Sequence, residues 1–439
     1  MKLKKILTVC FFFEFSILGF SKSVNNMELV KSGHWIYDAM NTLCSECEIV
    51  PLSGNAPLSV GELQMTFRRI DEEKLSESGK ALLSKSWDFL STRNNQYERG
   101  NLKIYGNAKV KPEFYLRKNK NIQWSFQYNF KDNCLSFNLG AQSSDYFVME
   151  MEPFVTRSYG YVHHLADNNI FPKSFSTNIE WKGDRMEFEQ PRWAYASTGY
   201  TGDSWGVTFV LGQEGVRHGN SLMGSIVYND SFLTDFYSQF NIFTDIFKFS
   251  MDVTEVELNR YLYLHQYEFN LFKKFKFSVL EGSFVNAPFD LRYVNPVMIQ
   301  HSHGGWYEYK NKKEYKWYGD ECHFCAYMCF LLEYNPVKNL RLYLNYAQTE
   351  IQTSWEVCDV PCGLGGQFGA EYRLSSASNG YWIFGVEGVY TSPWLYIKNG
   401  KEWSLISYRS SPNSSGPLES WIGFPSGPDC LGGQVKAGV

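Results

Sequence analysis

Arginines and aromatic residues with polar neighbours are the side chains of this sequence best suited to hold a ligand. An arginine guanidinium presents a planar fork of donors that fits a carboxylate or paired hydroxyls. A tryptophan offers a flat apolar face for a sugar ring. We predict that a set of such residues lines a lumen or its rim and contacts sugar hydroxyls or acidic sugars: Arg192, Trp205, Arg217, Asp290, Arg292, Asn295, His301 and Trp306.

Each of these residues also has a plainer structural interpretation. Asp290 and Arg292 stand two positions apart and could pair with each other inside the barrel. Asn295 precedes a proline, which is typical of a turn. Trp205 and Trp306 fit equally well into an aromatic girdle at a membrane interface.

Metal binding and catalysis have weaker support in the sequence. His301 and His303 would point the same way on a strand, and His323 lies between Cys322 and Cys325. Solvated loop histidines, with local disulfides or free thiols among the ten cysteines, explain this group without a metal. No nucleophile motif or phosphate-binding loop occurs. We therefore expect no metal, no cofactor and no enzymatic activity.

The elements that would position these residues are strands. Residues 121–130, NIQWSFQYNF, place Trp124, Phe126 and Tyr128 on one side of an extended chain. Amides and a hydroxyl occupy the other side. A soluble β-sandwich buries such an oily face, whereas a membrane barrel turns it to lipid and its polar face to a lumen.

The same alternation recurs later in runs of about ten residues, the length that a tilted strand needs to cross a bilayer. Strands of soluble sandwiches are usually about five or six residues long. The pattern therefore predicts a mainly β fold, an outer-membrane antiparallel β-barrel of about 16–18 strands. Its wet inner face would carry charged residues that oppose the apolar ones, among them Glu268, Glu333, Arg341, Glu371, Arg373 and Glu387.

The chain divides into three predicted parts. Residues 1–21 read as a signal peptide, with Lys2, Lys4 and Lys5 before a short apolar run. Residues 22–98 contain three amphipathic runs and form a small periplasmic helical unit, in which Ser59 stands three residues before Glu62 as in a capping box. Residues 99–439 form the transmembrane β-barrel.

The composition and the chain end add two expectations. The net charge is −4 and no basic stripe is present, so nucleic acid is not an expected partner. Aromatic residues make up 17% of the chain, which suits interfacial girdles and sugar-binding surfaces. The last run begins like a strand and stops at Val439, so we expect a C-terminally truncated barrel.

Three segments resemble the capsule-assembly Wzi family of outer-membrane barrels, most nearly the Wzi-like proteins of spirochaetes. They are PLSVGEL with FRRID, WGVTFVLGQEGVRHGNS, and EGSFVNAPFDLRYVNPVMIQHS. The resemblance spans roughly residues 34–430. It implies a barrel of about 18 strands, a helical bundle on the periplasmic side, and a lectin-like role in holding capsular or other surface polysaccharide.

Together these features predict a non-catalytic outer-membrane barrel that binds or anchors surface polysaccharide. The alternative is a porin or a transporter of hydrophobic solutes. A third class, a secreted lectin or glycosidase, would need paired carboxylates that the sequence does not place together. The expected partners are outer-membrane lipid, a surface glycan and, during biogenesis, the barrel-assembly machinery.

Overall fold

The computed structural model describes residues 9–10, 13–16, 22–93, 96–116, 118, 134–157, 175–177, 186–189, 193–230, 235–301, 324–349, 361–376, 380–398, 404–410 and 417–438. The alternating stretch 121–130 lies outside these residues.

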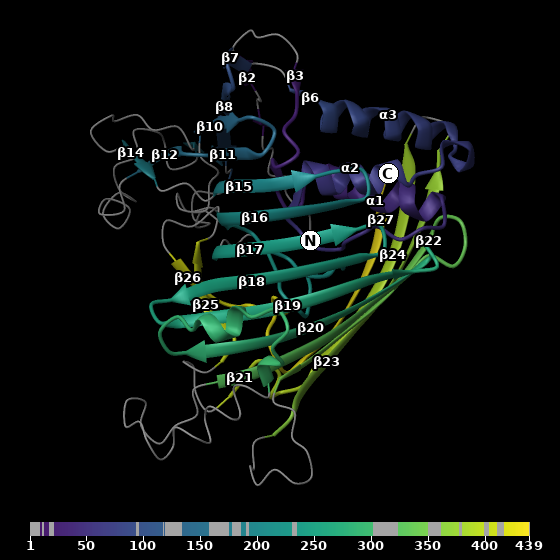
Figure 1. Ribbon diagram of the computed structural model, residues 1–439, viewed down its shortest axis with the longest axis vertical. Helices are drawn as coiled ribbons and strands as arrows, with labels where there is room; N and C mark the ends of the chain where they lie inside the picture. The colour runs from purple at the N-terminus through teal and green to yellow at the C-terminus, as the bar shows by residue number, and fades with distance from the viewer. Residues whose placement is uncertain are drawn as a thin grey trace.

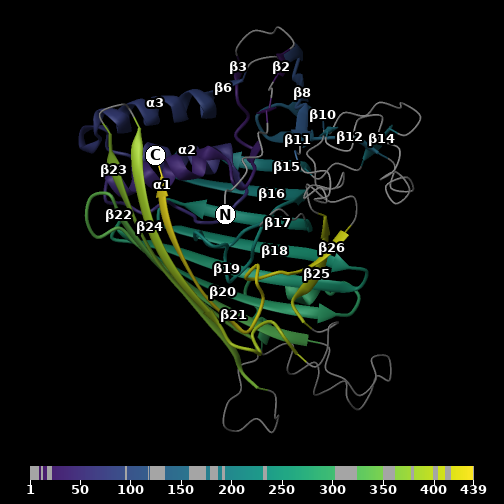
Figure 2. The same cartoon turned by 180° about the vertical axis from the view of Figure 1, so that it is seen from behind.

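One large antiparallel sheet forms the wall of a barrel (Figures 1 and 2). In the described part of the chain it is a sheet of 15 strands. In order around the wall they are β7 (Gln96–Arg99), β8 (Leu102–Val110), β10 (Leu135–Ser143), β11 (Phe147–Met151), β15 (Ala194–Thr201), β16 (Trp205–Glu214), β17 (Asp235–Thr244), β18 (Phe247–Glu257), β19 (Arg260–Leu271), β20 (Phe275–Asn286), β21 (Phe324–Tyr334), β22 (Leu340–Thr349), β23 (Gly363–Ser375), β24 (Tyr381–Thr391) and β27 (Cys430–Gly438).

Shorter strands accompany this wall. Three extend it, namely β2 (Phe13–Ser16) on β8, and β12 (Phe154–Arg157) with β14 (Met186–Glu189) beside β10. The others form small separate sheets: β1 (Val9–Cys10), β9 (Glu113–Leu116) and β13 (Phe175–Thr177); β3 (Lys22–Ser23) and β6 (Thr92–Arg93); β4 (Leu29–Val30) and β5 (Leu58–Ser59); β25 (Ile406–Ser410) and β26 (Pro417–Trp421). The mainly β barrel that the sequence predicts is therefore confirmed.

The two faces of the wall differ as the alternation predicts. Outward positions are apolar and open, with Phe368 55% and Val386 51% exposed. Inward positions are polar yet buried, with Arg341 1% and Glu387 2% exposed. Because lipid accepts an apolar surface and a lumen accepts a polar one, this arrangement is that of an outer-membrane barrel.

Three helices precede the wall strands and form the N-terminal unit, which we define as residues 22–93. They are α1 (Trp35–Glu46), α2 (Val60–Arg68) and α3 (Glu77–Ser91), with short 3₁₀ turns η1 (Glu72–Lys74) here and η4 (Leu291–Val294) after β20. As the capping-box spacing predicts, the Ser59 hydroxyl accepts the backbone N–H of Glu62 at 3.2 Å. Among the described residues, no helix is both long and apolar enough to cross a membrane.

The helices lie at one end of the barrel (Figure 1). The turns at that end are short, for example 272–274 between β19 and β20 and 335–339 between β21 and β22. The Val50 backbone N–H donates to Lys273 O at 2.8 Å, which places the N-terminal unit against these turns. Connections at the other end are mostly longer, for example 215–234 and 287–323, although 258–259 between β18 and β19 is short.

Replacing an outward apolar residue with arginine tests which solvent the wall faces. Leu344 lies midway along β22 and is 43% exposed. We expect Leu344→Arg to lower the free energy of unfolding by about 2–4 kcal/mol, since the charge would enter hydrocarbon. The measurement is guanidinium unfolding of the full chain in phospholipid vesicles.

The matched control is Val337→Arg, in the β21–β22 turn, where the side chain is 54% exposed. There we expect a change of about 0–1 kcal/mol, because the turn lies near or beyond the membrane interface. Equal effects at the two positions would contradict a lipid-facing β22.

Candidate functional site

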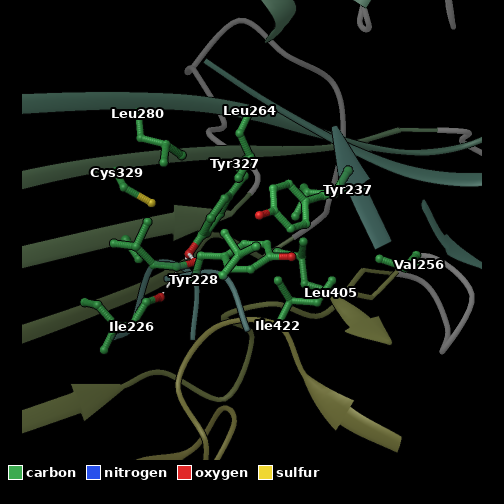
Figure 3. Packing of buried hydrophobic residues seen from close by; sticks show 14 of the residues in the cluster. Ile226, Tyr228, Tyr237, Val256, Leu264, Leu280, Tyr327, Cys329, Leu405 and Ile422 are labelled. Atoms are coloured by element: carbon green, nitrogen blue, oxygen red, sulfur yellow. Dashed lines mark hydrogen bonds between the residues drawn. The ribbon is translucent and has the colours of Figure 1, made fainter. Parts of the chain in front are cut away.

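The interior of the barrel is the candidate site, because inward polar and charged side chains of many strands converge there. An inner loop, residues 215–230, runs inside the wall after β16. Its apolar side chains pack against inward residues of β17 to β21 and against the segment that carries β25 and β26 (Figure 3). The residues labelled in this cluster are Ile226, Tyr228, Tyr237, Val256, Leu264, Leu280, Tyr327, Cys329, Leu405 and Ile422.

The N-terminal unit and the inner loop are joined to each other. Ala56 and Arg217 exchange two backbone hydrogen bonds, at 2.9 and 2.7 Å. The side-chain oxygen of Asn55 accepts a hydrogen bond from the backbone N–H of Gly219 at 3.3 Å. Gly219 has a φ of +85°, and a Cβ there would lie 2.7 Å from Leu331, so glycine is required for the loop to turn this close to the wall. We call the two segments together the plug.

The contact between the plug and the wall is polar. Glu268 of β19 accepts from the Ser53 hydroxyl at 2.6 Å and from the Asn55 amide at 3.3 Å. Gln266, on the same strand, accepts a second Asn55 N–H at 2.7 Å. Lys276 of β20 donates to a plug carbonyl, that of residue 51, at 3.4 Å. These bonds replace the water that would otherwise solvate the inward side chains.

A buried ion pair fixes α2 to β18. Lys248 Nζ lies 2.5 Å from Glu62 Oε1, and each side chain is at most 3% exposed. Burial raises the pKa of the Glu62 carboxyl, and the nearby ammonium of Lys248 opposes that rise. Each charge in such a pair depends on the other, because an unpaired charge in this environment lacks both water and a counter-ion.

A continuous charge network crosses the inner face from β20 to β23. Glu333 lies between Lys276, at 3.0 Å, and Arg341, at 2.8 Å. Arg341 also contacts Glu371 at 2.5 Å, and Arg373 contacts the same carboxylate at 2.8 Å. Lys276 stands directly opposite Glu333, and Arg341 directly opposite Glu371, while Arg341 reaches Glu333 diagonally across two neighbouring strands. The strand register therefore creates the network.

A small polar cavity remains between this network and the plug. Its volume is about 20 Å³, enough for one or two water molecules and too small for a solute. Its lining includes Asn55 and Asn220 of the plug and Lys276, Glu333, Arg341 and Asn345 of the wall. Where the plug meets this network, the described residues nearly fill the lumen, with polar groups on both sides of the remaining space.

His218 of the inner loop is fully enclosed by this arrangement. It is 0% exposed, with Nε2 2.9 Å from Asp252 Oδ2 and Nδ1 2.5 Å from Gln266 Oε1. Burial alone would lower the pKa of His218, but the Asp252 carboxylate and the hydrogen bonds outweigh it and leave the pKa above its ordinary value of 6.5.

The structure does not gather the predicted ligand-binding residues into one place. Trp205 begins β16 at an outward position and is 50% exposed, as the girdle interpretation would have it. Arg217 lies inside the barrel, where its guanidinium is 5.8 Å from the centre of the Tyr37 ring. Arg192 and Trp306 lie outside the described residues.

Asp290, Arg292 and Asn295 belong to the segment 287–301, which follows β20. Asp290 accepts from the Arg292 guanidinium at 2.6 and 2.9 Å, the pairing that was the alternative to ligand binding. The Asn295 side-chain oxygen accepts the N–H of Val297 at 3.2 Å, which makes a turn. The carboxylate and guanidinium thus satisfy each other.

The segment 287–301 lies on the outside of the wall. Tyr263 and Tyr267, at outward positions of β19, hydrogen-bond to its backbone at 3.0 and 2.6 Å. His301 donates its own backbone N–H to Glu281 of β20, also outward, at 2.9 Å. The lumen-lining position expected for Asp290, Arg292 and Asn295 is therefore wrong, because their segment folds over the outer face. Ligand binding at the rim stays a prediction for them.

The residues that organise the lumen were only partly visible in the sequence. Alternation marked Glu268, Arg341 and Glu371 as inward, but gave no reason to single out Asp252 or His218. A histidine in a glycine-bounded loop next to a strand with an inward aspartate is a signal too common to identify a site. Among the described residues, no three His, Cys, Asp or Glu side chains come together as a metal site would require. The seven cysteines whose side chains the structure describes are free thiols.

Removing one partner of the buried pair tests its role in holding the plug. We expect Lys248→Met to loosen the N-terminal unit by on the order of 3–5 kcal/mol, because Glu62 would be left buried without a counter-ion. The double variant Glu62→Met with Lys248→Met should regain most of that loss, since two apolar groups need no partner. Protection of the N-terminal unit against trypsin in detergent, measured over a series of guanidinium concentrations, gives the loss of stability in the single and in the double variant. Additive losses in the double variant would show that the pair does not act as a unit.

Comparison with known proteins yields weak structural likenesses. No family model and no characterised relative matches the sequence. OccAB3 of Acinetobacter baumannii is 9% identical, covers 75% of this chain and 87% of its own, and has a TM-score of 0.32. OccK11 (OpdR) of Pseudomonas aeruginosa is 10% identical over 68% and 83%, with a TM-score of 0.31. OmpT, an outer membrane protein of Vibrio cholerae, is 10% identical over 74% and 84%, with a TM-score of 0.25. Likenesses this weak carry no functional assignment, and the structure itself identifies the chain as an outer-membrane-type β-barrel.

Proposed function

We propose that the protein is a non-catalytic, porin-type channel of the outer membrane that passes small polar solutes and is closed here by its plug. The observation that carries this proposal is the polar, charged inner face of the wall. Its side chains form hydrogen bonds and ion pairs with a plug that is also polar. A purely structural core would be filled more stably by apolar side chains. Inward charges that must be kept paired suit a lumen that is hydrated in another state.

The same observation favours polar over hydrophobic solutes. Any path past the network of Lys276, Glu333, Arg341 and Glu371 runs along charged groups that attract water and polar molecules. A hydrophobic solute would have to displace that water without replacing its hydrogen bonds. In this proposal the apolar outer face binds outer-membrane lipid, and the barrel-assembly machinery inserts the chain.

The short turns suggest which way the barrel is oriented. Outer-membrane barrels have short periplasmic turns and long external loops. The N-terminal unit lies at the short-turn end, so we place it on the periplasmic side. If the plug closes the barrel from the periplasmic side, solutes from outside the cell reach it only after they have passed the external loops.

Anchoring of surface polysaccharide, as the resemblance to Wzi-like proteins implies, is the second candidate. One observation favours it: a filled lumen is compatible with a protein that holds a ligand at its outer rim and conducts nothing. The segment 287–301 follows β20 at the end with the longer, external loops and folds over the outer face of the wall. It would then be the place to seek glycan contacts.

Planar-bilayer recordings of the purified full chain separate these candidates. We expect rare, small openings in the wild type and at least a severalfold higher open fraction in Lys248→Met, because that variant loosens the plug. A channel that stays silent in both proteins would overturn the porin proposal. Binding of the non-conducting protein to polysaccharides on a glycan array would then support anchoring.

A matched control uses a charge outside the lumen. Lys80 of α3 contacts Glu77 at the surface, with its side chain 42% exposed. Lys80→Met removes the same group without touching the plug contacts, and we expect it to leave the open fraction unchanged. A rise equal to that of Lys248→Met would indicate a general loss of stability.

A further inference from the structure

The surroundings of His218 favour its protonated form. Nε2 faces the Asp252 carboxylate at 2.9 Å, and Nδ1 faces the Gln266 amide oxygen at 2.5 Å. A second partner identifies this atom as the amide oxygen of Gln266, because it also accepts the side-chain N–H of Asn55 at 2.7 Å. Nδ1 therefore donates to Gln266. Nε2 is not aligned for a hydrogen bond with Asp252, but at this distance the pair is attractive only when the ring is protonated, so the site favours an imidazolium.

This cation connects all the parts that close the lumen. His218 belongs to the inner loop, Asp252 to β18 and Gln266 to β19. Through Gln266 the contact continues to Asn55 of the N-terminal unit. The backbone around His218 is held as well, since its N–H donates to Tyr228 O at 3.1 Å.

The other charged groups around His218 favour the protonated ring. Glu268 of β19 adds a negative charge on the same side as Gln266. Beyond the Tyr228 ring, which meets the imidazole edge-on at 5.7 Å, Asp235 and Arg409 neutralise each other. Arg217, the preceding residue, directs its guanidinium to the Tyr37 ring. Loss of the proton would leave Asp252 buried without its cation, so water has to enter or the loop has to leave.

We propose that His218 is a pH-operated latch: the imidazolium holds the plug in the barrel, and the neutral ring releases the inner loop and opens the lumen. Only the opening of the lumen rests on the proposed channel function. The release of the loop stands on the described contacts alone.

The direction of the pH dependence follows from linkage. The pKa of His218 is raised in the closed state, whereas a hydrated histidine in the released loop has its ordinary value near 6.5. The stabilisation is therefore complete below about pH 6.5 and is lost as the pH rises through the closed-state value. Between the two values, release frees one proton, so the release equilibrium rises about tenfold per pH unit.

Hydrogen–deuterium exchange of the full chain in detergent measures the latch without any need for conduction. The readout is the protection factor of amides 216–229, which removes the intrinsic pH dependence of exchange. In the wild type we expect it to fall about tenfold per pH unit above pH 6.5. In His218→Gln it should be low and level across the same range, because glutamine keeps a donor but carries no charge.

Two further variants keep the test decisive. His34→Gln removes the histidine that caps α1, outside the latch, and should keep the wild-type pH response. Asp252→Asn should move the response to lower pH, and it serves in place of His218→Gln if that variant does not fold. A protection factor that is level in the wild type, or that falls equally in all variants, would overturn the latch.

Bilayer recordings over the same pH range separate the latch from the channel proposal. Openings that increase with pH in the wild type and are frequent at every pH in His218→Gln support both. A pH-dependent protection factor with no conductance at any pH supports the latch and overturns the channel. Conductance that is present but independent of pH keeps the channel and overturns the latch.

Discussion

The pairing of backbone groups in a lipid environment is the constraint on which the rest of this structure depends. Strands that cross hydrocarbon must pair all their N–H and C=O groups, which demands a sheet curled on itself. A two-residue period then sends every second side chain to lipid and every other one inward. The inward face of so wide a barrel cannot be filled by its own side chains, so it needs either water or an inserted part of the chain.

In this molecule an inserted plug meets the inward face, and the charges it meets are already arranged in pairs. Lys276, Glu333, Arg341 and Glu371 neutralise one another along the wall without any contribution from the plug. Lys248 and Asp252 are different, because their partners, Glu62 and His218, come from the plug. The wall is thus electrostatically complete in one sector and incomplete in another. In the incomplete sector, buried charges of the wall depend on the position of the plug.

The sequence was informative where a short repeat determines structure and silent where distant segments meet. Alternation placed Arg341 and Glu371 on the inner face correctly, because period two needs no knowledge of neighbours. It did not predict that they touch, since this depends on the register of β22 against β23. The amphipathic runs of the N-terminal unit predicted helices, and Ser59 their capping, but an apolar stripe does not tell which surface will cover it. The outward position of Asp290 and Arg292 was missed for a related reason: a loop that folds back over the wall has no periodic signal.

The insertion of the N-terminal unit has a consequence for how the chain is assembled. Glu46 is bonded to Tyr381, 335 positions later in the chain, and Asn55 to Gln266, 211 positions later. The part of the protein that is synthesised first therefore has no place to dock until nearly all of the wall exists. It must wait, folded or not, beside a growing sheet and be enclosed as that sheet curls. Contacts this distant form slowly, so the first segment reaches its final position only after the later strands are in place.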